Sequence, residues 1–200
     1  MSGEVCSGGL YMNDIERWTK EKKMKVNEKK TKNLIFNFSK NYQFSTDVKL
    51  KGESIETINS IKLLGTTITS DLRWNENTKL IIKNSNKRMQ FLHRAAKFTN
   101  NVKDLKQIYM LQIRSKLEQS AVVWHSSLTR KNISDLERVQ KSALKLILKE
   151  RYVSYKNTLN VIGIDSLEQR REKLCLKFAK ACVKHEQDRK STRSALNVPL

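Results

Sequence analysis

The spacing of apolar side chains divides the chain into a short extended part and a longer helical part. Between residues 33 and 70, short runs of β-branched and aromatic residues are separated by turn signals such as Lys51-Gly52-Glu53, a pattern typical of a small antiparallel sheet. The first expected strand covers residues 33–38. Gly65 interrupts the last apolar run, which indicates a bulge or a close approach of the backbone. After Trp74 the apolar residues recur at steps of three and four, which predicts helices.

The helical part contains four expected helices. Apolar faces predict the first two over residues 77–97 and 102–122. The third and fourth begin at Ser134 and Ser166, each followed three residues later by Glu or Gln, which is the spacing of a capping box. A short helix over residues 152–159 is expected between them.

These patterns predict an α+β fold that is predominantly helical, with a small antiparallel sheet followed by a helical bundle. We expect a Gly- and Ser-rich disordered start over residues 1–12 and a helix plus the small sheet over residues 13–72. A helical domain follows over residues 73–186. The polar residues 187–200 are expected to form a disordered tail.

The charge balance points to a polyanionic partner. The chain has 40 Lys and Arg residues against 20 Asp and Glu, a net charge of +20, which favours contact with nucleic acid. Lys outnumbers Arg by 28 to 12, and Lys suits phosphate contacts better than bidentate base recognition. We therefore expect sequence-independent contact with phosphates from basic residues at helical spacing after Trp74: Lys83, Lys87, Arg88 and Arg94.

Several classes of chemistry have no motif in this sequence. His93, His125 and His185 stand outside every metal-binding spacing, and neither a G-x-S-x-G turn nor a Gly-rich phosphate loop occurs. We therefore expect no metal site and no cofactor in this chain. No apolar run reaches the length of about 18 residues of a membrane span, so we expect no membrane partner and an intracellular location, in the cytoplasm or the nucleus.

Four stretches, in this order, resemble the end of the palm and the thumb of reverse transcriptases from jockey-like non-LTR retrotransposons. The family shows W…N-x-M-x-L-N-x-x-K-T-K before an apolar strand, an L-G-x-x-I…L-x-W hairpin, and a W…L-x-x-V-Q-x-x-A-L-[KR] thumb segment. The matching stretches here are Trp18–Lys32 with the apolar run to Phe38, Ile61–Ile68 with Asp71-Leu72-Arg73-Trp74, Trp124–Leu128, and Leu136–Lys145.

The resemblance implies roles for particular residues. It makes residues 13–72 the end of a palm and residues 73–186 a thumb that holds RNA–DNA or duplex template–primer by its phosphates. Lys30 matches the family lysine thought to protonate the leaving pyrophosphate, a general-acid role, and Lys32 is its neighbour and a nucleic-acid contact. Leu64 and Gly65 match the hairpin that grips the primer end, where Gly permits close approach of the backbone.

One departure from the family pattern decides the expected activity. The complete family enzyme holds two Mg²⁺ ions on aspartates that include a Y-x-D-D turn, and this sequence contains no Asp-Asp pair. We therefore expect a truncated, catalytically inactive fragment of an RNA-directed DNA polymerase that retains template–primer binding, with other parts of a retroelement polymerase as a further partner. The alternative is a non-enzymatic helical module for protein–protein interaction.

Overall fold

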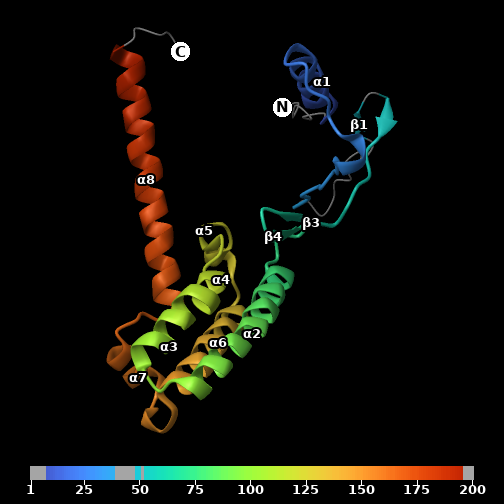
Figure 1. The fold of residues 1–200 in the computed structure, drawn as a ribbon. Coiled ribbons are helices and arrows are strands. Elements are labelled where there is room, and N and C mark those ends of the chain that lie inside the picture. The colour runs from blue at the N-terminus through green and yellow to red at the C-terminus, as the bar shows by residue number, and fades with distance from the viewer. Residues whose placement is uncertain (1–7, 39–47, 51, 196–200) are drawn as a thin grey trace. The chain divides into compact units, whose positions relative to one another are not determined.

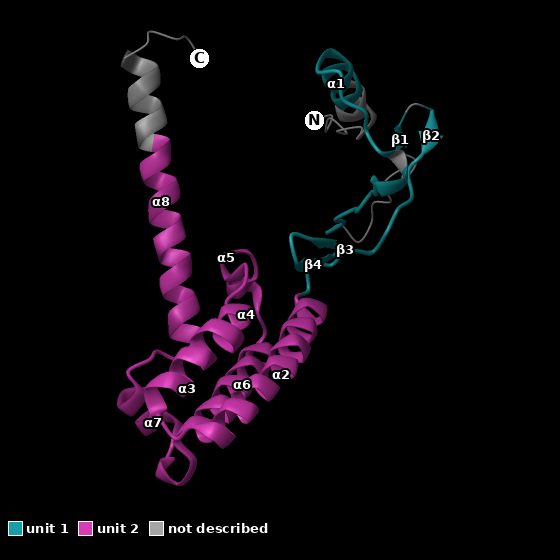
Figure 2. Cartoon of the chain, viewed as in Figure 1, with its two compact units in different colours: residues 1–73 teal, residues 74–200 magenta. Residues whose placement is uncertain are grey.

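The computed structural model describes residues 8–38, 48–50 and 52–195. The chain divides into two compact units, Met1–Arg73 and Trp74–Leu200 (Figures 1 and 2). Helices dominate the described residues, and two small antiparallel sheets accompany them. The expected α+β, predominantly helical class is therefore confirmed.

The described residues of the first unit form one α-helix, a short 3₁₀ turn and two β-hairpins. The helix is α1 (Gly8–Glu21). Strand β1 (Lys49–Leu50) pairs with β2 (Glu53–Ser54), and β3 (Ser60–Leu63) pairs with β4 (Thr66–Thr69), both antiparallel. The two hairpins form separate sheets, so the single sheet expected between residues 33 and 70 is replaced by two smaller ones.

The expected strand over residues 33–38 is wrong. Asn33 forms an isolated parallel bridge with Thr57, and residues 34–38 are irregular. The side chains there are only partly covered, and Phe38 is 75% exposed. A run of apolar residues forms a stable strand only where a neighbouring strand or helix covers it, and the described residues supply no such neighbour.

The expected disordered start is also wrong where the structure describes it. Residues 8–12 are helical as the first part of α1, while residues 1–7 lie outside the described residues. Tyr11, Ile15 and Trp18 are spaced by four and three residues, so the helical pattern begins earlier than the Gly- and Ser-rich composition suggests.

The second unit is a helical bundle in which two long helices, α2 (Asn75–Phe98) and α6 (Arg130–Leu148), pack side by side (Figure 1). Helix α3 (Val102–Ile108) runs on into the π-helix η2 (Tyr109–Arg114) and then α4 (Ser115–Leu117). The large apolar side chains of this core that are fully buried include Leu92, Leu105, Tyr109, Ile113, Leu117, Trp124, Leu136, Leu144 and Leu167.

The expected continuous helix over residues 102–122 is interrupted. Ser120 adopts a left-handed conformation with φ of 54°. A residue in this conformation cannot continue a right-handed helix, so the chain changes direction here. The chain then forms the short helices α5 (Ala121–Trp124) and η3 (His125–Ser127). The new direction buries Trp124 completely.

The caps of the later helices differ from expectation in one case. Helix α6 begins at Arg130, and the Thr129 hydroxyl accepts a hydrogen bond of 3.2 Å from the Asn132 N–H. Ser134 therefore lies inside the helix and is not its cap. The cap at Ser166 is confirmed, since its hydroxyl accepts from the Gln169 N–H at 3.2 Å.

Two short elements lie between α6 and the last helix. The turn η4 (Lys149–Arg151) follows α6 directly, and α7 (Tyr155–Ile162) comes next. The Ser154 hydroxyl caps α7 at its start, and Gly163, with φ of 68°, ends it.

The last helix, α8 (Leu167–Ala195), is longer than expected. Residues 187–195 are helical, so the predicted disordered tail is wrong there, and residues 196–200 lie outside the described residues. The sequence after Leu167 contains neither Gly nor Pro before Pro199, and its Lys, Arg, Glu and Ala residues have high helix propensity. Helix α8 projects beyond the rest of the bundle (Figure 1), which leaves Phe178 55% exposed.

Candidate nucleic-acid interface

The positive charge is concentrated in the second unit. Residues 74–200 contain 27 Lys and Arg against 11 Asp and Glu, a net charge of +16, whereas residues 1–73 contain 13 against 9. A helical unit with this excess attracts polyanions over its whole surface. The geometry of the helices decides where the charge gathers.

Helix α2 carries a row of cationic side chains along one face. At 3.6 residues per turn, its members fall within an arc of about 80°, and all are exposed. The described residues make no hydrogen bond or ion pair with any of them. We call this set the α2 cation row: Lys79, Lys83, Lys87, Arg94 and Lys97.

The cationic side chains lie on the face of α2 opposite to its buried residues, which are apolar in the second half of the helix. Met89, Leu92 and Ala96 are buried against the bundle, so the remaining positions of the helix point to solvent. One carboxylate, Glu76, lies in the first turn of α2 in the same arc as the row. A negative charge at that end is favoured by the helix dipole, and it leaves the rest of the row positive.

A groove of about 760 Å³ runs between α2 and α6. Lys79, Lys83 and Lys87 line its α2 side, and Asp135 and Arg138 line its α6 side. Arg138 and Asp135 form an ion pair of 3.1 Å, so their charges offset each other. The groove thus presents the three lysines as its excess charge, with its floor formed in part by Val139 and Ile82.

Arg88 does not belong to this row. Its Nη1 donates hydrogen bonds to the Gln112 carbonyl oxygen at 3.2 Å and to Gln112 Oε1 at 3.4 Å. The side chain therefore ties α2 to the π-helix η2. Of the four basic residues singled out in this helix, the structure brings Lys83, Lys87 and Arg94 together and separates Arg88.

Lys30 and Lys32 lie in the first unit, on a compact turn. Lys30 ends the 3₁₀ turn η1 (Glu28–Lys30), and its N–H donates to Asn27 Oδ1 at 3.2 Å. The Thr31 hydroxyl donates to the Asn27 carbonyl oxygen at 2.9 Å. The Asn-x-x-Lys-Thr stretch therefore closes on itself and leaves Lys30 exposed, while the Lys32 ammonium pairs with Glu56.

Leu64 and Gly65 form the tip of the β3–β4 hairpin. Leu63 pairs with Thr66, so the turn has two residues, with φ of 49° at Leu64 and 86° at Gly65. Positive φ at both positions is the pattern of a type I′ turn, which matches the twist of a hairpin. The bulge interpretation of Gly65 is wrong. Leu64 is 90% exposed at this tip.

Sequence reasoning missed two members of the α2 cation row and a second cationic cluster. Lys79 and Lys97 could have been found, because they continue the spacing of Lys83 and Arg94 along the same face. The second cluster, Lys106 and Arg114 with Arg170, depends on a π-helix and on chain segments more than fifty residues apart in sequence. No local signal in the sequence points to it.

The described residues contain no group of three or more His, Cys, Asp or Glu side chains that could hold a metal ion. Among the helices described, none combines the length and the apolarity needed to cross a membrane.

Comparison with known proteins gives no match: no family model, no curated protein and no solved structure is similar to this chain at a significant level.

Proposed function

We propose that this chain is the end of the palm and the thumb of a jockey-like non-LTR retrotransposon reverse transcriptase, and that it binds duplex nucleic acid through phosphates. Four stretches of sequence in the family order support the family. The observation that supports the binding most strongly is the α2 cation row, whose ammonium and guanidinium groups have no partner among the described residues.

The dimensions of the row suit a nucleic-acid backbone. Lys79 and Lys97 are eighteen residues apart in one helix, which is about 27 Å at a rise of 1.5 Å per residue. A duplex presents one negative charge for about every 1.7 Å of its axis, so phosphates are available opposite every cation of the row. Lys predominates in it, which favours contact that does not depend on base sequence.

Polymerisation is not part of the proposal for this chain. Its seven Asp residues include no adjacent pair, so it lacks the Asp-Asp turn on which the family enzyme holds Mg²⁺. In a complete enzyme, Lys30 would supply the proton for the leaving pyrophosphate, and the exposed hairpin tip at Leu64 and Gly65 would contact the primer. The compact Asn27–Thr31 turn supports a fixed position for Lys30.

The salt dependence of binding tests this proposal. Fluorescence anisotropy with a labelled RNA–DNA duplex measures the affinity of the full chain over a series of salt concentrations. The slope of log K against log salt is negative. The triple variant Lys83→Gln, Lys87→Gln, Arg94→Gln should make it less negative by about 2.7, which is about 0.9 per lost phosphate contact.

A control variant separates this face from the general charge. The variant Lys177→Gln, Lys180→Gln, Lys184→Gln removes an equal number of charges from exposed positions of α8. It should change the slope by less than the value of about 0.9 that corresponds to one phosphate contact. Equal losses in the two triple variants would contradict a localised interface. An affinity of the wild-type chain that does not change with salt would contradict phosphate binding itself.

A second candidate function rests on α8. Three large apolar side chains in its projecting part are more than half exposed: Leu176, Phe178 and Val183. Leu176 and Val183 are seven residues apart and share one face of the helix, whereas Phe178 lies on the opposite face. Apolar residues exposed on a helix can serve as contacts with another protein. The alternative is therefore a non-enzymatic helical module that recruits another protein, such as another part of a retroelement polymerase. Sedimentation velocity should then show self-association, or association with an added palm fragment, that Phe178→Asp abolishes. A monomer at every concentration, with and without that fragment, would count against this alternative.

A further inference from the structure

A second pocket lies in the helical unit, at the junction of α3, the π-helix η2, α7 and α8. It has a volume of about 630 Å³, within the range of about 300–1,000 Å³ typical of small-ligand sites. Three cationic side chains from three different elements line it, Lys106, Arg114 and Arg170, together with one carboxylate, Asp165. It shares no residue with the α2–α6 groove.

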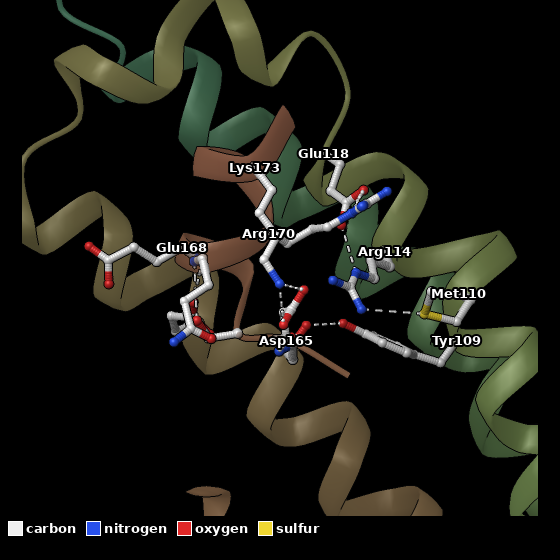
Figure 3. A network of polar contacts seen from close by, with 12 residues as sticks. Tyr109, Met110, Arg114, Glu118, Asp165, Glu168, Arg170 and Lys173 are labelled. Carbon is white, nitrogen blue, oxygen red and sulfur yellow. Dashed lines mark hydrogen bonds and ion pairs between the residues drawn. The ribbon is translucent and has the colours of Figure 1, made fainter. Parts of the chain in front are cut away.

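Two guanidinium groups meet in this pocket at a shared carboxylate (Figure 3). Arg114 Nε donates to Glu118 Oε1 at 2.6 Å, and Arg170 Nε lies 3.5 Å from Glu118 Oε2. Each arginine therefore uses its Nε for the structural contact. Among the described residues, the only partner of the four terminal nitrogens is the Met110 sulfur, 3.5 Å from Arg114 Nη1, and a thioether is a weak acceptor.

The burial of Arg114 makes these free donors unusual. Its side chain is 4% exposed, and a buried charged group normally has its hydrogen-bonding capacity filled. Glu118, at 16% exposure, is shared with Arg170 and neutralises only one of the two guanidinium charges. The pocket therefore holds an excess of positive charge and of hydrogen-bond donors beside the buried Arg114.

The remaining charged groups of the pocket are already fixed in place. Lys106 Nζ donates to the Ile162 carbonyl oxygen at 2.6 Å, which holds its ammonium at the end of α7. Both Asp165 oxygens accept from Lys173 Nζ, at 2.8 and 2.9 Å (Figure 3), and this hydrogen bond lowers the pKa of Asp165. The charged groups of the lining, Lys106, Arg114 and Arg170 against Asp165, carry two positive charges in excess. Glu118 and Lys173 contact these groups from outside the lining, and their charges offset each other.

The backbone that forms the pocket is itself specialised. Tyr109–Arg114 is a π-helix, a conformation that is rare in proteins and occurs frequently at functional sites. It contributes both Met110 and Arg114 to the lining. On the opposite side, the lining includes Gly163 at the end of α7, where φ of 68° allows the sharp turn into α8.

From these contacts we infer that this pocket binds a phosphomonoester dianion. Its two excess charges match the dianion, and the free terminal nitrogens of two arginines match the several acceptor oxygens of a phosphate. The volume leaves room for an attached organic group, and Leu159 and Ile164 supply apolar contact. The inference does not rest on the proposed function, because a different set of residues carries it.

The same chemistry has two sources, a small free phosphomonoester and the terminal phosphate of a nucleic-acid strand. In both, the phosphate has a single ester bond to carbon, so its three other oxygens share two negative charges. An internal phosphodiester has two ester bonds and carries one charge only. The experiment therefore uses phenyl phosphate as the free ligand. To test strand ends, the experiment also compares a single-stranded oligonucleotide that has a 5′-phosphate with the same oligonucleotide that has a 5′-hydroxyl.

Nuclear magnetic resonance on the ¹⁵N-labelled full chain measures binding directly through the arginine Nε–Hε signals. Phenyl phosphate should shift the Arg114 and Arg170 signals in a saturable way, and sodium acetate at the same ionic strength should not. The Arg170 side chain is 42% exposed. Its replacement in Arg170→Gln should weaken binding about tenfold, the effect of one charge-assisted hydrogen bond. Lys106→Met should act in the same direction.

The matched control is Lys156→Gln, an exposed lysine of α7 outside the pocket, which should leave the affinity unchanged. A shift with the 5′-phosphorylated strand that the 5′-hydroxyl strand does not produce assigns the site to strand ends. A shift with phenyl phosphate alone assigns it to a free ligand. Equal affinity of Arg170→Gln and wild type, or equal shifts with acetate, would overturn the inference.

Discussion

Replacement of Gln140 by Leu should destabilise the helical unit strongly, because Gln140 joins three elements from a fully buried position. Its Oε1 accepts from the Tyr109 hydroxyl, and its Nε2 donates to the Tyr155 hydroxyl at 2.8 Å and to the Asp165 carbonyl oxygen at 3.2 Å. Burial raises the pKa of Tyr109, so this phenol stays protonated and keeps donating over the ordinary pH range.

The magnitude follows from the groups that lose their partners. Leu is close to Gln in size, so no large cavity forms. The Tyr109 hydroxyl is left buried without its acceptor, and the Asp165 carbonyl oxygen loses its donor, while Tyr155 keeps its hydrogen bond to Glu137. At about 1–3 kcal/mol for each of these two polar groups left unsatisfied, Gln140→Leu should lower the free energy of unfolding by about 2–6 kcal/mol.

Urea unfolding followed by circular dichroism at 222 nm measures this loss, since the helices of the second unit dominate the signal. The control is Tyr109→Phe in the Gln140→Leu background, which removes the orphaned hydroxyl and should restore part of the lost stability. A change below about 0.5 kcal/mol, the level of an ordinary surface substitution, would refute the network as a source of stability.

Three further predictions concern caps, the hairpin and pH. Thr129→Ala should cost about 1 kcal/mol in urea unfolding, because the Asn132 N–H loses its cap. Gly65→Val should disorder the β3–β4 turn, since a β-branched residue is strained at φ of 86°; amide chemical shifts report it, and an unchanged hairpin would contradict the turn assignment. Burial and the charge of Arg171 lower the pKa of His125 from its ordinary 6.5. The unfolded chain therefore binds more protons at this histidine than the folded chain does. The free energy of unfolding should fall as pH drops below about 6.5, and it should fall less steeply in His125→Gln.

The helices of the second unit could be predicted from sequence because their faces are repeated signals. Met89 and Leu92 bury one side of α2, and the α2 cation row occupies the other, so the period of 3.6 predicts both the core and the charged face. The cap at Ser166 was predictable for the same local reason. Its hydroxyl and the N–H that it satisfies are three residues apart.

The errors arose where a local pattern competed with a partner elsewhere in the chain. Residues 34–38 have strand composition but no described strand to pair with, and Ser134 has a capping-box sequence although Thr129 caps the helix earlier. Arg88 has the spacing of a phosphate contact, and Gln112 engages it from 24 residues away. Periodicity describes one element at a time, so it cannot identify such partners.

The sequence by itself determined the class of the fold, the excess of positive charge and the face of α2 that presents it, because each depends on residues close together in the chain. The tertiary structure alone decided the pairing of Glu118 with both Arg114 and Arg170, and the pocket beside it. That pocket requires α3, the π-helix, α7 and α8 to meet. Burial of apolar surface drives such a meeting, and burial is not directional, so the pattern of a single element does not specify which charged groups it brings together.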